Sequence, residues 1–155
     1  SGQTISQPYT VAFQSQLLQI EKGDKILEIG TGSGYQAAVL CEMGVKLYTI
    51  ERIRELYRKT SMFLPSINYY PKKMIYGDGY QGYSDESPYD GIIVTAGATE
   101  VPENLLSQLK LNGKMVIPLG NDVQKMLLYT KKSDANYDIK DFGDFQFVPM
   151  LKDKI

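Results

Sequence analysis

Apolar and polar residues along the chain follow two spacings, one typical of helices and one typical of buried strands. In residues 8–20, Phe13, Leu17 and Ile20 recur at helical spacing, which predicts a helix. Residues 23–30 form a short apolar run that ends at a glycine, which predicts a buried strand. By the same reasoning we expect further helices at 33–44, 53–63 and 101–114, and further strands at 45–51, 74–77, 89–98, 115–120, 124–130 and within the tail at 145–150.

This order of elements predicts an α/β fold. Strands that alternate with helices form right-handed βαβ units around a mainly parallel sheet. The strand-rich end of the sequence, from 115 onward, indicates antiparallel strands added at one edge. No internal repeat, low-complexity tract or linker interrupts the pattern, so we expect one domain over residues 1–155.

Composition narrows the class of protein. Net charge is −1 and no basic stripe stands out, so we expect no nucleic-acid partner. No run of about 18 apolar residues occurs, so we expect no transmembrane helix, and no signal peptide is recognisable. Cys41 is the single cysteine and forms no disulfide within the chain, which suits a reducing cytoplasm.

Histidine is absent from all 155 residues. A Ser-His-Asp triad is therefore excluded, and a typical zinc site is not expected. We predict no metal site. Any chemistry must proceed without an imidazole as general base.

The clearest motif is a glycine-rich loop between the first strand and the next helix. Gly30, Gly32 and Gly34 are separated by Thr31 and Ser33. Glycine permits positive φ and lets a ligand approach the main chain, and the following helix offers free N–H groups. The next strand ends at Glu51, whose carboxylate could accept hydrogen bonds from both hydroxyls of a ribose.

The spacing favours one nucleoside cofactor over another. A dinucleotide fingerprint needs G-x-G-x-x-G, and Tyr35 stands where its third glycine would be. Glu28, two positions before Gly30, would repel a phosphate and suit a cation. S-adenosylmethionine has a sulfonium and an ammonium and no phosphate, so we predict it as the cofactor. The competing interpretation, that the glycines only form a tight turn, loses weight because acidic residues flank them.

Asp78-Gly79 follows the third strand and would lie beside the adenine ring in this topology. A turn aspartate is the simpler interpretation of the pair alone, and Glu51 alone could be a solvated charge. Taken together, the two carboxylates favour a cofactor site. The small residues from Thr95 to Ala98 fit strand-end packing and room for a substrate equally well.

The chain resembles the protein-L-isoaspartate O-methyltransferases over essentially its whole length. The segments that carry the resemblance are GQTISQPYTVA (2–12), LEIGTGSGYQAAVL (27–40), YTIER (48–52), GDGYQGY (77–83), PYDGIIVTAGA (88–98), QLKLNGKMVIPLG (108–120) and FVPM (147–150). The resemblance implies a doubly wound, Rossmann-like methyltransferase fold. It also implies methyl transfer from S-adenosylmethionine to the free carboxyl of L-isoaspartyl residues in damaged proteins, which leaves S-adenosylhomocysteine and begins repair through a succinimide.

The resemblance also implies roles for particular residues. Ser6 would be the active-site residue and would orient the substrate carboxylate, although a helix cap is the simpler interpretation from local chemistry. The expected cofactor-binding residues are Gln3, Thr4, Ile5, Glu28, Gly30, Thr31, Gly32, Gly34, Glu51, Arg52, Asp78 and Gly79, and the expected substrate-binding residues are Ser6, Thr95, Ala96 and Val148.

Two departures from the family pattern leave alternatives open. The family's region before the T-I-S segment is not in this sequence, so we expect a trimmed or shortened member, and the ending FVPMLKDKI also differs. The alternatives are a methyltransferase for a small molecule and a cofactor-binding domain without turnover. We expect isoaspartyl proteins as partners and a monomeric state.

Overall fold

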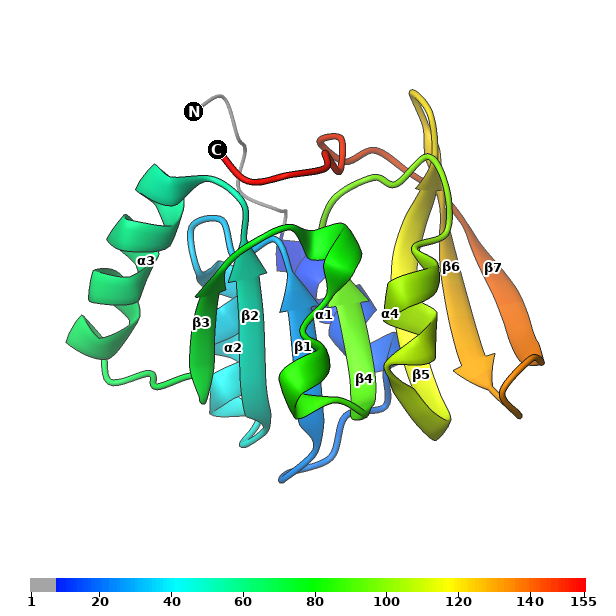
Figure 1. Ribbon diagram of the computed structural model, residues 1–155, viewed down its shortest axis with the longest axis horizontal. Helices are drawn as coiled ribbons and strands as arrows, with labels where there is room; N and C mark the ends of the chain where they lie inside the picture. Colours follow the sequence, from blue (N-terminus) through cyan, green and yellow to red (C-terminus); the bar gives the residue numbers. More distant parts are fainter. Residues whose placement is uncertain (1–7) are drawn as a thin grey trace.

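A single seven-stranded sheet organises the protein (Figure 1). The structure is a computed structural model and describes residues 8–155. The strand order is β3-β2-β1-β4-β5-β6-β7. The strands span Lys25–Ile29 (β1), Lys46–Glu51 (β2), Lys73–Tyr76 (β3), Tyr89–Val94 (β4), Leu109–Gly120 (β5), Gln124–Lys131 (β6) and Tyr137–Phe145 (β7).

The sheet is parallel from β3 to β5, and β6 and β7 are antiparallel additions at one edge. This confirms the predicted mainly parallel sheet. After β3 the chain returns to the other side of β1 to form β4, so the strand order reverses between these two strands. Ligands of open α/β sheets bind at such a reversal, beyond the carboxyl ends of the strands.

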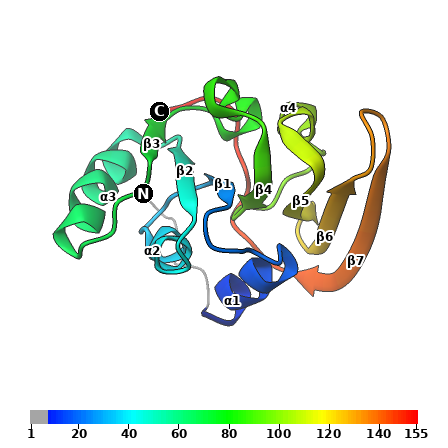
Figure 2. The ribbon, with the colours of Figure 1, turned by 90° about the horizontal axis from the view of Figure 1, so that it is seen from below.

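Helices cover both faces of the sheet (Figure 2). The helices α1 (Pro8–Leu17), α2 (Tyr35–Glu42) and α3 (Arg54–Ser66) lie on one side, and α4 (Glu103–Ser107) lies on the other side with the 3₁₀ turns η1 (Gly79–Gln81) and η2 (Ser84–Glu86). Within residues 8–155, no helix has both the length and the apolar character that crossing a membrane requires.

Both faces of the central strands are buried, which is why these strands read as continuous apolar runs. Leu27 and Ile92 pack on one face with Leu105 of α4. Ile26 and Ile93 pack on the opposite face with the helices α2 and α3. The sheet is therefore the shared wall of two apolar layers.

The helix predicted at 101–114 was wrong in length. Helix α4 ends at Ser107, and β5 begins at Leu109. Leu109 pairs with Tyr89, and after an irregularity Lys114 pairs with Gly91. The extra residues between these pairs form a bulge, which carries Asn112 at a φ of 66°. The Asn-Gly pair therefore marks a bulge within a strand and not the end of a helix.

The last strand was predicted at 145–150 and lies instead at Tyr137–Phe145. The turn after β6 closes early, where the Lys132 N–H donates to the Asn136 carbonyl at 2.9 Å, so the strand that pairs with β6 starts at once. Residues 147–155 leave the sheet edge and cross above its strands (Figure 1). Pro149 forms a bridge with Gly97 there.

Candidate functional site

A cavity of about 170 Å³ opens at the carboxyl ends of the strands, where the strand order reverses. Segments far apart in the sequence line it: the loop after β1, the ends of β2 and β4, the first turns of α2 and α3, and the C-terminal segment. Its lining residues include Gly30, Thr31, Gly32, Glu51, Arg52, Gly79, Thr95, Ala96 and Val148, all of which the sequence predicted as site residues.

The glycine loop adopts a backbone that other residues rarely adopt, with φ of 94° at Gly30, 54° at Gly32 and 89° at Gly34. Gly30 lies against the Thr95 hydroxyl, which donates to the Gly30 carbonyl at 2.8 Å. A Cβ on Gly34 would lie 2.8 Å from the Thr60 Cγ2, so this glycine allows the loop to pack on α3. Gly34 supports the loop from behind and is not among the lining residues.

Glu51 joins the end of β2 to the glycine loop. Its Oε1 accepts the Gly32 N–H at 2.8 Å, and its Oε2 accepts the Ile53 N–H at 2.9 Å. The residue is 4% exposed and lines the cavity. A carboxylate has about four acceptor positions, so two remain for the hydroxyls of a bound ribose.

Glu28 does not line the cavity. It faces the helices, is fully buried, and its Oε1 accepts the Thr49 hydroxyl at 2.6 Å. Thr49 in turn lies 2.6 Å from the Thr31 hydroxyl, so a chain of hydrogen bonds leads from Glu28 to the glycine loop. Burial, together with the nearby Glu51 carboxylate, raises the pKa of Glu28 from 4.5 to about 8. Glu28 thus lies beneath the loop and reaches the cavity only through other residues.

Asp78 and Gly79 have different roles. Gly79 lines the cavity, and a methyl group on it would press into Ile29 and lie 3.5 Å from the Met150 Cε. Asp78 is not among the lining residues, and its Oδ1 accepts the Tyr80 N–H at 2.9 Å. Asp78 therefore caps the turn that brings Gly79 to the cavity wall.

Arg52 connects the cavity to the C-terminal segment. It lines the cavity, its Nε donates to the Asp153 carbonyl at 2.8 Å, and a terminal nitrogen donates to the Lys152 carbonyl at 3.3 Å. Residues 148–151 of this segment form another part of the lining. The guanidinium therefore holds the C-terminal segment beside the cavity.

Thr95, Ala96 and Val148 meet where β4 ends. All three line the cavity. The Gly97 N–H donates to the Val148 carbonyl at 2.7 Å, which fixes the C-terminal segment beside the residues after β4. The predicted residues Gln3, Thr4, Ile5 and Ser6 lie outside the described residues 8–155.

Sequence reasoning did not assign several apolar and polar lining residues. They are Val11, Ile29, Ser33, Tyr35, Gln36, Ile50, Ile53, Leu56, Pro149, Met150 and Leu151. Ile29, Ser33 and Ile50 could have been inferred because each adjoins a predicted site residue in sequence. Leu56 and Val11 gave no such signal, since an apolar residue on a helix looks the same whether it lines a cavity or the core.

The residues present fit an adenosine-containing cofactor. A carboxylate with free acceptor positions stands beside a glycine loop, and Ile53 and Leu56 supply an apolar wall on which a base could lie. Adenosine combines a flat apolar ring with a ribose that donates hydrogen bonds, and this surface meets both requirements.

Comparisons with known proteins point the same way. The model of the family described as protein-L-isoaspartate(D-aspartate) O-methyltransferase matches residues 1–154. The protein-L-isoaspartate O-methyltransferase of Christiangramia forsetii is 62% identical over 154 residues, which cover 99% of this chain and 72% of that protein. The protein of the same name from Flavobacterium psychrophilum is 55% identical over the same shares.

Solved structures agree with the sequence relatives. A structure titled protein-L-isoaspartate O-methyltransferase superimposes with a TM-score of 0.87 at 30% identity, covering 96% of this chain and 50% of that one. A structure from Plasmodium falciparum, described as a protein-L-isoaspartate O-methyltransferase of that organism in complex with S-adenosyl-L-homocysteine, gives 0.82 at 27% identity. The match covers 99% of this chain and 78% of that one.

Proposed function

This chain belongs to the protein-L-isoaspartate(D-aspartate) O-methyltransferase family, and on that premise we propose that it methylates the free carboxyl of L-isoaspartyl residues in damaged proteins or peptides, with S-adenosylmethionine as methyl donor. The observation that carries the proposal is the placement of Glu51 against the glycine loop, at the cavity where the strand order reverses. This arrangement gives the ribose of the cofactor an acceptor, and the glycines let the cofactor approach the main chain of the loop closely.

The proposed reaction needs no general base from the protein. The substrate carboxyl, with an ordinary pKa of about 4, is already ionised at neutral pH, so no histidine is needed. When bound, the cofactor supplies a methyl group on a sulfonium. The substrate oxygen forms a bond to that methyl carbon, and the electron pair of the broken carbon–sulfur bond stays on sulfur. The protein aligns the oxygen, carbon and sulfur and excludes water, which favours a step that neutralises opposite charges.

Each part of the cavity has a proposed task. The main chain from Gly30 to Gly32, Glu51, Arg52 and Gly79 bind the cofactor, while Gly34 supports the loop from behind. Thr95, Ala96 and Val148 receive the substrate at the end of β4, where Gly97 holds the C-terminal segment in place. Ser6 orients the substrate carboxylate by donating a hydrogen bond, and Gln3, Thr4 and Ile5 line the cofactor and substrate; these four roles rest on the family resemblance.

We also propose that the chain acts as a single methyltransferase domain, as a monomer in the cytoplasm, on proteins and peptides and not on nucleic acid. The net charge of −1 supports the expectation of no nucleic-acid partner, and the single cysteine supports a reducing compartment. Cys41 is half-buried on α2, and burial raises its thiol pKa to about 11, so it is not a reactive thiolate.

A pair of synthetic peptides tests the proposed reaction. They are identical except that one carries L-isoaspartate and the other L-aspartate, and labelled S-adenosylmethionine reports methyl ester formation. Methylation of the isoaspartyl peptide alone is expected. Methylation of neither peptide, with S-adenosylhomocysteine still bound, would favour a cofactor-binding domain without turnover. Methylation of a small acid instead would favour a small-molecule enzyme.

A further inference from the structure

Two glutamines are buried and do not line the cavity. The side chain of each forms hydrogen bonds with the main chain of a segment that lines the cavity or leads to it. Gln108, between α4 and β5, is 7% exposed, and Gln124, at the start of β6, is 2% exposed. Neither side chain belongs to the cofactor or substrate residues named above. In both side chains, the amide nitrogen donates to a main-chain carbonyl and the amide oxygen accepts a main-chain N–H. These main-chain groups lie outside regular strand pairing.

Gln108 holds the loop between β3 and β4. Its Oε1 accepts the Tyr83 N–H at 3.0 Å, and its Nε2 donates to the Gln81 carbonyl at 3.0 Å. The amide thus pairs with the loop much as a neighbouring strand would, through one N–H and one carbonyl two residues apart. The main-chain carbonyl of Gln108 accepts the Tyr89 N–H at 2.8 Å, so Gln108 also holds the end of the loop where β4 begins.

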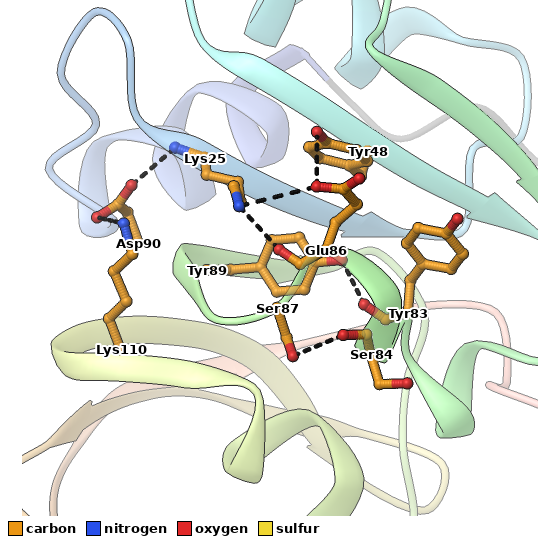
Figure 3. Close-up of polar contacts among 9 residues, drawn as sticks. All are labelled: Lys25, Tyr48, Tyr83, Ser84, Glu86, Ser87, Tyr89, Asp90 and Lys110. Atoms are coloured by element: carbon orange, nitrogen blue, oxygen red, sulfur yellow. Dashed lines mark hydrogen bonds and ion pairs between the residues drawn. The ribbon is translucent and has the colours of Figure 1, made fainter.

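The loop is shaped to receive this amide. Gly82 lies between the two bonded residues with a φ of 64°, and a methyl group on it would lie 2.8 Å from the Gln108 Nε2. Farther along the loop, the Tyr89 hydroxyl donates to the Tyr83 carbonyl at 2.6 Å (Figure 3). Gln108 and Tyr89 therefore fix Tyr83 through its N–H and its carbonyl.

The held segment leads directly into the cavity wall. The Gly82 N–H donates to the Gly79 carbonyl at 3.1 Å, and the Gln81 N–H donates to the Asp78 carbonyl at 3.1 Å. Residues 78–82 therefore form one compact turn, with Gly79 on the cavity and Gln81 bonded to Gln108. A shift of Gln81 would move Gly79, because few soft torsions separate them.

Gln124 ties the C-terminal segment to the turn between β5 and β6. Its Oε1 accepts the Phe147 N–H at 2.8 Å, and its Nε2 donates to the Asn121 carbonyl at 2.6 Å. A methyl group on Gly97 would lie 2.7 Å from the Gln124 Cδ, so a glycine again permits the approach. The next residue along the segment is Val148, which lines the cavity.

We infer that Gln108 and Gln124 are positioning residues for two different walls of the cavity, Gln108 for the cofactor wall at Gly79 and Gln124 for the substrate wall at Val148. The assignment of the two walls rests on the proposed function. Loss of either amide removes the side-chain partners of part-buried main-chain groups, and the loop then shifts to find other partners. Displacements of about 1 Å are enough to impair alignment in an active site.

Two substitutions separate the two roles. Gln108→Met and Gln124→Met keep the length of the side chain and remove its hydrogen bonds. We expect Gln108→Met to raise the dissociation constant for S-adenosylhomocysteine, measured by calorimetry, about fivefold or more, with less than a twofold change in the KM for an isoaspartyl peptide at saturating cofactor. We expect the reverse for Gln124→Met.

Lys131→Met is the matched control. Lys131 is 9% exposed, and its Nζ donates to the Leu109 carbonyl at 3.1 Å, next to Gln108, and to neither loop. It should lower the melting temperature and leave both constants unchanged. Equal changes of both constants in the two glutamine variants, or no change in either, would overturn the inference.

The outcomes distinguish a failure of this inference from a failure of the proposed function. If the wild-type chain methylates the isoaspartyl peptide and the glutamine variants match it, the inference alone fails. If the wild-type chain binds S-adenosylhomocysteine without turnover, the dissociation constants alone decide the Gln108 assignment, and peptide affinity measured by calorimetry decides that of Gln124. If a methionine variant does not fold, Gln108→Asn and Gln124→Asn replace it, since each keeps a neutral amide but is one methylene group too short to keep both hydrogen bonds.

Discussion

The Glu51 carboxylate accepts the main-chain N–H of Gly32 at 2.8 Å, and this bond joins the loop after β1 to the end of β2 at the cavity wall. Its other oxygen accepts the N–H of Ile53 at the entry to α3. One side chain thus shapes the loop and presents the acceptor that we assign to the ribose.

Glu51→Gln is therefore expected to weaken S-adenosylhomocysteine binding about tenfold or more, because an amide replaces one acceptor with a donor that faces an N–H group. Isothermal titration calorimetry measures the loss. Glu55→Gln, which changes an exposed carboxylate paired with Lys59 on α3, is the control and should bind as the wild type does. Equal affinities in the two variants would remove Glu51 from the site.

The free energy of unfolding should fall as pH rises from about 4.5 to about 8, because Glu28 stays protonated in the folded protein over this range. Its pKa is raised from 4.5 to about 8 in the folded protein, so the folded state holds a proton that the unfolded state releases. The contribution of Glu28 to the free energy of unfolding is complete below about pH 4.5 and is lost by about pH 8. Glu28→Gln should flatten this dependence, as measured by urea unfolding at pH 5.5 and pH 8.5. Parallel curves for the variant and the wild type would contradict the assignment.

Gly34→Ala should cost more stability than Gly143→Ala. Both glycines have positive φ, 89° and 96°. Alanine at either position therefore lowers the free energy of unfolding by about 1–2 kcal/mol, because it must adopt the left-handed conformation. At Gly34 the added methyl also lies 2.8 Å from Thr60 and 3.2 Å from Leu64, whereas at Gly143 nothing lies within 4 Å. Overpacking adds about 1–3 kcal/mol at Gly34, which chemical denaturation would resolve. Equal losses would mean that α3 yields to the methyl group.

Ser6→Ala should lower turnover on the isoaspartyl peptide more than it weakens cofactor binding. The expected reason is the loss of one hydrogen bond to the substrate carboxylate, which misaligns the attacking oxygen. Steady-state kinetics and calorimetry on the same preparation give the two quantities. A loss of equal size in both would assign Ser6 to the cofactor and not to the substrate.

The sequence by itself determined the order of helices and strands, the mainly parallel sheet and the place of the glycine loop. These features are local, because apolar spacing and glycine positions act within a few residues along the chain. The bulge in β5 and the position of β7 were decided by pairing with Tyr89 and with β6, which lie elsewhere in the sequence. No local signal separates a bulge from a helix end at Asn112-Gly113.

For the site, the sequence located Glu51, Gly79 and Thr95, because strand ends in such a fold converge on one edge. It also placed Glu28 at the cofactor, and only the packed sheet shows that this side chain points into the helical layer. Tertiary structure likewise decided that Gln108 and Gln124 contact loops more than 20 residues away in sequence. Side-chain direction and long-range hydrogen bonds depend on which surfaces come together, and that is settled only when the whole core packs.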